Sequence, residues 1–214
     1  ERARLAAMAH PRRREQFLAG HGYARELLAE AEGGRAGDWT LERDAHGAPL
    51  ARRRGRPAEL HLSLAHSGGQ LAGAVAEAPV GVDIEHPLRP RDLLGLASAL
   101  YAPSFVEAMA MEDEATQRER FFHRWTLDEA RAKALGTGLR LKALCEQGWE
   151  RAREALADGW TWNLATGWLA LSLPDPATNP ILPHWSGRVP EASPVPWRWR
   201  GRTHARGRED RDGG

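Results

Sequence analysis

The sequence has little cysteine, little lysine and no long hydrophobic run. Its 214 residues include one cysteine, Cys145, so no internal disulfide can form, and nothing else indicates an oxidising compartment. No apolar run approaches the roughly 20 residues that a membrane-spanning helix needs. The first residues do not resemble a signal peptide. We therefore expect a cytoplasmic protein without a membrane partner.

Lysine is almost absent, because 28 of the 30 basic residues are arginine and only Lys133 and Lys142 are lysine. Each lysine raises the question of whether its position needs a compact ammonium rather than a planar guanidinium. The net charge is only +1, yet residues 1–60 hold 12 arginines against 9 acidic residues, and residues 188–214 hold 7 against 4. Such an excess can attract phosphates or an acidic protein, although most such runs are solvated surface.

The order of predicted elements is typical of an α+β domain with a mostly antiparallel sheet. Apolar spacing predicts helices over residues 12–32, 91–100, 104–111 and 115–135, with a further candidate helix over 141–157. Alternation predicts strands over residues 39–41, 60–64, 71–76, 80–85, 160–164 and 168–173. The rest of 37–57 is rich in Gly, Pro and Arg and is predicted to be loop.

Two carboxylates share one face of the strand predicted over 80–85. Because side chains alternate across a strand, its apolar residues face one way, and Gly81, Asp83 and Glu85 face the other. The carboxylates would lie about 7 Å apart along the strand. They can hold a hard cation between their oxygens, while Gly81 leaves room for a substrate against the backbone. The alternative is an ordinary half-buried strand with one solvated face.

A tryptophan, a carboxylate and a lysine share one face of the helix predicted over 115–135. Trp125, Glu129 and Lys133 recur every four residues. The simple interpretation is a surface Glu–Lys pair worth about 0.3 kcal/mol. Trp125 indicates instead that this face is partly covered, where charged groups need partners. If it meets the acidic strand, the third carboxylate and the lysine complete a site for Mg²⁺ and phosphate.

His66 and Ser67 stand at the end of a predicted strand, directly before a glycine turn. A lone histidine in such a place is more often a hydrogen-bonded structural residue than a ligand. Near a phosphate, however, a protonated imidazole can donate from both ring nitrogens.

Taken in order, these motifs resemble the signature of the larger 4′-phosphopantetheinyl transferase family. The set is His66-Ser67, then Gly81-Val82-Asp83-Ile84-Glu85, then Trp125-Thr126, Glu129-Ala130, Lys133-Ala134, Gly136 and Gly138-Leu139. The resemblance extends from about Arg12 to the strand over 168–173. It implies two similar α+β halves, residues 1–100 and 101–187, with the active site between them. A largely disordered tail would follow over 188–214.

The resemblance implies a magnesium-dependent transfer of 4′-phosphopantetheine from coenzyme A to a serine of an acyl or peptidyl carrier protein, with release of 3′,5′-ADP. Asp83, Glu85 and Glu129 would bind Mg²⁺ together with the coenzyme A pyrophosphate. Lys133 would contact the phosphates, where charge stabilisation mainly acts in this reaction class. Glu129 would also take the serine proton.

Coenzyme A would be bound, by the same resemblance, through His66, Ser67 and Lys133, with Arg25 as a weaker candidate at the nucleotide end. The arginine excess would attract an acidic carrier protein, mainly through the association rate. A chain built of two similar halves would act as a monomer.

Four positions depart from the family pattern. Asp128 stands where relatives usually carry lysine, directly before the glutamate expected to bind metal. Ala48 and His21 replace basic residues, and Ala65 replaces the serine before the motif histidine. These changes point to weaker coenzyme A binding, an altered donor or a domain that no longer catalyses. The effect of Asp128 depends on its direction, because neighbouring helix positions are about 100° apart.

Three other functions stay open. They are a non-catalytic relative that binds a carrier protein or coenzyme A, a nucleic-acid-binding protein, and an unrelated Mg²⁺ phosphohydrolase. No nucleic-acid motif is recognised, and the basic stretches are separated by a near-neutral middle. The late tryptophans fill the core or form a stacking platform for adenine, and core filling is favoured. They are Trp160, Trp162, Trp168, Trp185, Trp197 and Trp199.

Overall fold

A computed structural model of the chain describes residues 2–44, 47–139, 147–174 and 193–201. The helices are α1 (Arg2–Ala6), α2 (Pro11–Glu32), α3 (Leu93–Leu100), α4 (Pro103–Ala110) and α5 (Glu114–Leu135). The strands are β1 (Trp39–Arg43), β2 (Pro49–Arg53), β3 (Arg56–Ser67), β4 (Gln70–Ala76), β5 (Gly81–Glu85), β6 (Gly148–Arg151), β7 (Gly159–Leu164), β8 (Gly167–Ser172) and β9 (Val195–Arg200).

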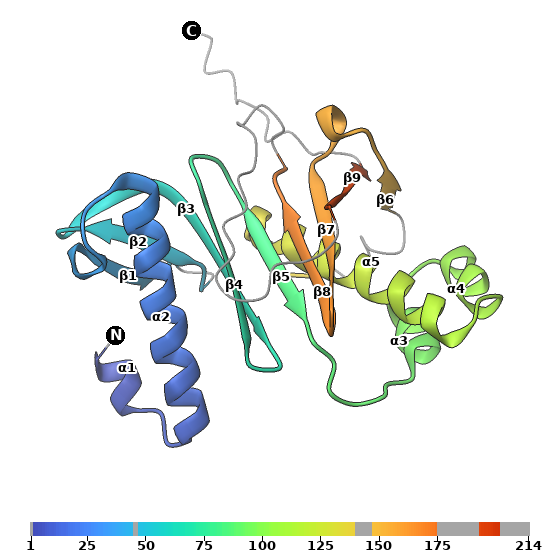
Figure 1. The fold of residues 1–214 in the computed structure, drawn as a ribbon, viewed down its shortest axis with the longest axis horizontal. Helices are drawn as coiled ribbons and strands as arrows, with labels where there is room; N and C mark the ends of the chain where they lie inside the picture. Colours follow the sequence, from blue (N-terminus) through green and yellow to red (C-terminus); the bar gives the residue numbers. More distant parts are fainter. Residues whose placement is uncertain (1, 45–46, 140–146, 175–192, 202–214) are drawn as a thin grey trace, which may run out of the picture.

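These elements form four layers in the order helix, sheet, sheet, helix (Figure 1). The first sheet has the strand order β1-β2-β3-β4, and the second has the order β5-β8-β7-β9-β6. Every strand pairing in both sheets is antiparallel. The predicted α+β class with antiparallel sheets is therefore confirmed.

The outer helical layers each bury one apolar stripe. On α2, Ala24 and Leu28 are completely buried against Trp39 and Leu62 of the first sheet. On the other side of the molecule, Leu127 and Ala130 of α5 pack on the second sheet. Removing such apolar surface from water is the main driving force for joining helix to sheet.

The two sheets share a core whose first-sheet side is made of small residues. Ala65 and Ala72 face Val82 and Ile84 of β5 and the larger side chains of β7 and β8. Small side chains let the sheets come close. They bring β3 against the edge of β5 that is not paired with β8.

Two serines of β3 attach that free edge by hydrogen bonds. The Ser63 hydroxyl accepts the Val82 N–H at 3.0 Å, and the Ser67 hydroxyl accepts the His86 N–H at 3.0 Å. Ser63 is buried, so an unpaired Val82 N–H there would be costly. The strand that carries the predicted carboxylates is therefore held from both sides.

Three strands differ from the sequence prediction. β2 lies in the segment predicted as loop, and β6 lies in the candidate helix over 141–157. That helix is wrong for the described part, which also holds a short 3-10 turn, Glu154–Leu156. β9 lies in the predicted tail over 188–214, so disorder is wrong for its six residues. Residues 140–146, which include Cys145, and 202–214 lie outside the described residues.

The late tryptophans fill the core rather than form an exposed platform. Trp160 and Trp162 are buried between the sheets. Trp168 stacks on Phe122 with ring centroids 4.6 Å apart. The Trp197 indole N–H donates to the Thr161 hydroxyl at 2.8 Å. The core-filling interpretation is confirmed for Trp160 and Trp162, and the half-buried Trp168 and Trp197 pack against core residues. Trp199 is half-buried and packs edge-on against Trp149, with ring centroids 5.1 Å apart. Trp185 lies outside the described residues.

Candidate functional site between β5 and α5

The backbone of α5 lies directly on β5 at Gly81. A Cβ added to Gly81 would lie 1.8 Å from the Ala130 carbonyl oxygen and 2.7 Å from the Ala134 nitrogen. Only a residue without a side chain permits this approach. The space expected beside Gly81 for a substrate is thus filled by the helix. That detail of the sequence prediction is wrong.

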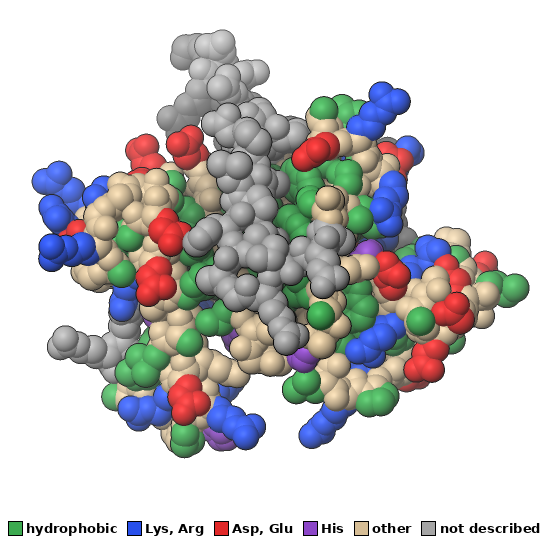
Figure 2. All heavy atoms as spheres, in the orientation of Figure 1, with side chains coloured by type: hydrophobic (Ala, Val, Ile, Leu, Met, Phe, Trp, Pro, Cys, Tyr) green, Lys and Arg blue, Asp and Glu red, His purple; other side chains and the backbone are tan. Residues whose placement is uncertain are grey.

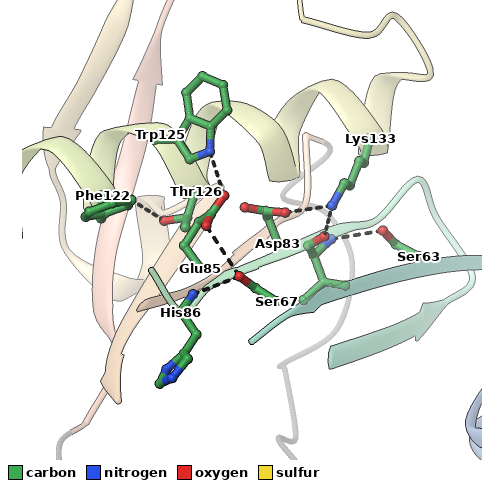
Figure 3. A network of polar contacts seen from close by, with 10 residues as sticks. Ser63, Ser67, Asp83, Glu85, His86, Phe122, Trp125, Thr126 and Lys133 are labelled. Carbon is green, nitrogen blue, oxygen red and sulfur yellow. Dashed lines mark hydrogen bonds and ion pairs between the residues drawn. The ribbon is translucent and has the colours of Figure 1, made fainter. Parts of the chain in front are cut away.

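The close approach brings the acidic face of β5 against the face of α5 that carries Lys133 (Figure 3). The Lys133 Nζ donates to Asp83 Oδ1 at 2.7 Å and to the Val82 carbonyl oxygen at 3.1 Å. The acidic face of β5 and the Lys133 face of α5, both predicted from the sequence, are therefore in contact. Two of the three N–H groups of the ammonium are used in these contacts.

Asp83 is a buried carboxylate with one unsatisfied oxygen. Its Oδ2 is inaccessible to water and has no hydrogen-bond partner among the described residues. Burial raises the pKa of Asp83 to about 6, although the charge and the hydrogen bond of Lys133 oppose the rise. A buried acceptor without a partner is costly, so this oxygen marks a place where a cation or a donor would be stabilised.

Glu85 is held by neutral donors through both of its oxygens. The Trp125 indole N–H donates to Oε1 at 3.0 Å. The Ser67 hydroxyl lies 3.5 Å from Oε2. The sequence identified Trp125 only as a sign of a covered face, and it assigned Ser67 to coenzyme A. The sequence did not predict either contact with Glu85, because both depend on how β3, β5 and α5 pack together.

Glu129 interacts electrostatically with both strand carboxylates and with Lys133. Burial raises the pKa of Glu129, the charge of Glu85 adds to the rise, and Lys133 opposes it. The charges of Glu129 and Glu85 also raise the pKa of Asp83. Three carboxylates and one ammonium thus act on one another within a partly buried space.

The donor set suits a hard divalent cation, since it consists of carboxylate oxygens with one buried oxygen unsatisfied. Within the described residues, however, no three acidic, histidine or cysteine side chains are gathered at metal-binding distances. Lys133 holds Asp83, while Trp125 and Ser67 hold Glu85. The residue types fit Mg²⁺, and the side chains are arranged as an ion pair and a hydrogen-bonded carboxylate.

His66 and Arg25 are not brought to these carboxylates. Alternation along β3 places Ser67 on the side of β5, and it places exposed His66 on the opposite side, with Leu62 and Leu64, which pack toward α2. Arg25 belongs to α2, which covers the outer face of the first sheet (Figure 1). The predicted residues therefore fall into two groups on opposite faces of the first sheet.

Asp128 points away from the acidic site. Its side chain is fully buried, pairs with the Arg124 Nε at 2.7 Å and accepts the Trp149 indole N–H at 2.9 Å. The Arg124 guanidinium also donates to the Gln147 carbonyl oxygen at 2.6 Å and lies over the Tyr101 ring. The departure at position 128 thus belongs to a structural network that anchors α5 to its neighbours.

The other three departures also lie away from the carboxylates. Ala65 packs in the core between the sheets. Ala48 lies in the β1–β2 turn, where its N–H donates to Asp44. The His21 ring packs at a tilt against Phe17 along α2, with ring centroids 3.9 Å apart. None of these substitutions changes the charge between β5 and α5.

Known proteins share the part of the chain that carries this site. The sequence model of the 4′-phosphopantetheinyl transferase superfamily matches residues 79–163, which contain β5, α5 and the helices between them. The chain is 34% identical over 99 residues to the 4′-phosphopantetheinyl transferase psf-1 of Bacillus pumilus, covering 46% of this chain and 40% of that protein.

A longer match is to the 4′-phosphopantetheinyl transferase HetI of Nostoc sp., 31% identical over 141 residues. It covers 65% of this chain and 59% of HetI. The 4′-phosphopantetheinyl transferase Sfp of Bacillus subtilis is 29% identical over 83 residues, 39% of this chain and 36% of Sfp. The matches span between about a third and three fifths of these relatives. The chain is thus similar to 4′-phosphopantetheinyl transferases over the stretch that carries β5 and α5.

Proposed function

We propose that the protein transfers 4′-phosphopantetheine from coenzyme A to a serine of an acyl or peptidyl carrier protein and releases 3′,5′-ADP. The observation that carries the proposal is the pairing of Lys133 with Asp83, whose second oxygen is buried without a partner, beside Glu85 and Glu129. This arrangement lies within the stretch that matches the superfamily.

Asp83, Glu85 and Glu129 would hold Mg²⁺, which suits their oxygen donors. When bound, the ion supplies charge neutralisation at the pyrophosphate and orients it. The family resemblance supports this assignment, as does the unsatisfied oxygen of Asp83.

Lys133 would bind a phosphate oxygen with its remaining N–H. Two of its N–H groups are occupied by Asp83 and the Val82 carbonyl, which fix the ammonium between β5 and α5. Its side chain is 31% exposed, which leaves part of it accessible to a ligand. An ammonium at this point offsets charge that builds up on the departing pyrophosphate oxygen.

Glu129 would accept the proton of the carrier-protein serine. The serine oxygen forms a bond to the phosphorus next to pantetheine, the bond from that phosphorus to the bridging oxygen breaks, and 3′,5′-ADP leaves. Burial raises the pKa of Glu129, which makes the carboxylate a stronger base than a free glutamate.

The nucleotide end of coenzyme A would lie toward α2. His66 and Arg25 are both on that side of the first sheet, and both are able to donate to phosphate. Ser67 is on the other side of the sheet and contacts Glu85, so this part of the proposal leaves coenzyme A binding to His66 and Arg25.

The two sheets, each covered by one long helix, would correspond to two similar halves related by a pseudo-twofold axis. The boundary near residue 100 stays a prediction. β5 precedes that boundary but pairs with β8 in the second sheet. We further propose that the protein is a cytoplasmic monomer that binds no nucleic acid. Among the residues that the structure describes, the helices are too short or too polar to span a bilayer.

A nucleic-acid-binding function finds little support on the visible face. In Figure 2, Lys and Arg side chains lie at several separate places and are mixed with Asp and Glu. Nucleic-acid binding by charge depends on a continuous basic surface.

The proposed activity is tested by intact-mass analysis of several apo carrier proteins incubated with the full chain, coenzyme A and Mg²⁺. We expect one carrier to gain the mass of one phosphopantetheine and to lose that gain when EDTA is added. No gain on any carrier, from folded protein that still binds coenzyme A or a carrier, would identify a non-catalytic relative instead.

A further inference from the structure

We propose that Trp125 and Ser67 are positioning residues that preset the Glu85 carboxylate as a cation ligand. This inference rests on the proposed function, since it concerns a carboxylate of the same site. It assigns to Trp125 a role beyond covering the helix face, and to Ser67 a role other than coenzyme A binding.

The two donors fix the Glu85 carboxylate from two other elements. The Trp125 indole of α5 donates to Oε1 at 3.0 Å, and the Ser67 hydroxyl at the end of β3 lies 3.5 Å from Oε2 (Figure 3). The Ser67 oxygen already accepts the His86 N–H, so its own proton is available to Glu85. With one donor on each oxygen, rotation about the last side-chain bond is restricted.

The donors leave room for a cation. Each carboxylate oxygen accepts more than one bond, so one donor per oxygen leaves acceptor capacity on both. Glu85 is half-buried, so part of the residue remains accessible.

The donors are also neutral. Within the described residues, Lys133 pairs with Asp83, and no ion pair to Glu85 is found. A neutral donor stabilises the charged form without compensating it. The two hydrogen bonds therefore bring no positive charge to Glu85, whereas Asp83 is paired with the Lys133 ammonium.

Trp125 itself is held in place by its neighbours on α5. Its ring lies parallel to Phe121, with centroids 6.3 Å apart and an interplanar angle of 8°. This packing orients the indole N–H toward β5. Trp125→Phe would keep an aromatic ring and remove the donor together with the smaller ring of the indole, a loss that the same change at another tryptophan reproduces.

The test is the binding of Mn²⁺ alone, a paramagnetic substitute for Mg²⁺, to the full chain, measured by electron paramagnetic resonance. Wild type is compared with Trp125→Phe, Ser67→Ala and Glu85→Gln. The matched control is Trp197→Phe, which removes an indole hydrogen bond to Thr161 away from Glu85. Losing a residue that orients a ligand typically weakens metal binding roughly 10-fold or more.

We expect Trp125→Phe to weaken Mn²⁺ binding about 10-fold, Ser67→Ala to weaken it less because its contact is longer, and Trp197→Phe to leave it unchanged. A second readout does not involve metal. The indole N–H signal of Trp125, assigned with Trp125→Phe in a ¹H–¹⁵N spectrum, should shift in Glu85→Gln while that of Trp197 does not.

Several results would overturn the inference. Wild-type affinity in Trp125→Phe and Ser67→Ala, with binding lost in Glu85→Gln, would refute positioning and leave the proposed function intact. An equal loss in Trp197→Phe would show a general effect of losing a tryptophan. Unchanged binding in Glu85→Gln, or no binding by wild type, would contradict the metal site itself.

Discussion

Two buried aspartates in this protein have opposite surroundings. Asp128 is satisfied on both oxygens, by Arg124 and by the Trp149 indole. Asp83 is satisfied on one, by Lys133, and its other oxygen has no partner in the described structure. Burial raises the pKa of both carboxyls. The complete network indicates a structural role, and the incomplete one indicates a site prepared for a ligand.

Asp128→Asn is expected to destabilise the fold by about 3 kcal/mol, because it leaves the buried Arg124 guanidinium without its counter-charge. The measurement is urea unfolding at neutral pH. The control is Glu42→Gln, which breaks an exposed pair with Arg52 and should cost less than about 1 kcal/mol. Equal costs for the two variants would refute the structural role of Asp128.

His123 makes the stability depend on pH. Its side chain is only 7% exposed, its Nε2 is hydrogen-bonded to Asn163 Oδ1, and it lies 4.0 Å from Glu119. Burial lowers the pKa of His123, although the Asn163 contact and Glu119 oppose the change. The folded state therefore prefers neutral imidazole. Its contribution to stability is complete above pH 6.5 and is lost as the pH falls toward the folded-state pKa.

The expected result is that wild type loses more unfolding free energy than His123→Gln between pH 7.5 and pH 5.5, in metal-free buffer. The raised pKa of Asp83 gives the opposite slope, because protonation near pH 6 favours the folded state. That contribution is common to both proteins and cancels in the difference. Identical pH dependence would mean that His123 is not held neutral.

At the scale of elements, the acidic strand and the long helix were predictable because each shows a regular spacing of residue types within its own segment. Alternation placed Asp83 and Glu85 on one face of β5, and the four-residue repeat placed Lys133 on one face of α5. The contact between these faces depends on Gly81, which lets the helix backbone approach. The sequence shows the glycine, but it does not reveal whether a substrate or the α5 backbone occupies the space beside it.

Other elements were missed because strand pairing, rather than an apolar pattern of their own, stabilises them. β2 is rich in arginine and lacks an apolar run, yet it pairs with β1 and β3 on both sides. β9 lies between β7 and β6, which are far from it in sequence. His66 was grouped with Ser67 by adjacency, whereas adjacent strand residues face opposite ways.

Gly81→Ala tests the contact between β5 and α5. The new Cβ would collide with the helix backbone at Ala130, and backbone cannot rotate away as a side chain can. We expect a loss of about 3 kcal/mol in unfolding free energy. Gly22→Ala is the control, because no atom lies within 4 Å of its Cβ and alanine favours a helix interior by about 0.5–1 kcal/mol. A Gly81→Ala protein as stable as wild type would refute the close approach.

At the scale of the molecule, the first sheet separates the two groups of predicted ligands. β3 carries His66 on the side of α2 and Ser67 on the side of β5, and its serines join the two sheets. In the proposed function, one coenzyme A molecule would reach from the first group to the second. The sequence predicted both groups through the family resemblance, but the separation follows only from strand direction and layer order.

The central claim is that the carboxylates and Lys133 between β5 and α5 perform the transfer. It is tested most directly by the mass gained by an apo carrier protein with Glu129→Gln and with Glu114→Gln, each with coenzyme A and Mg²⁺. Glu114 lies exposed in the first turn of the same helix. The account predicts the phosphopantetheine mass with Glu114→Gln and no gain with Glu129→Gln. Equal gain with both variants would contradict it.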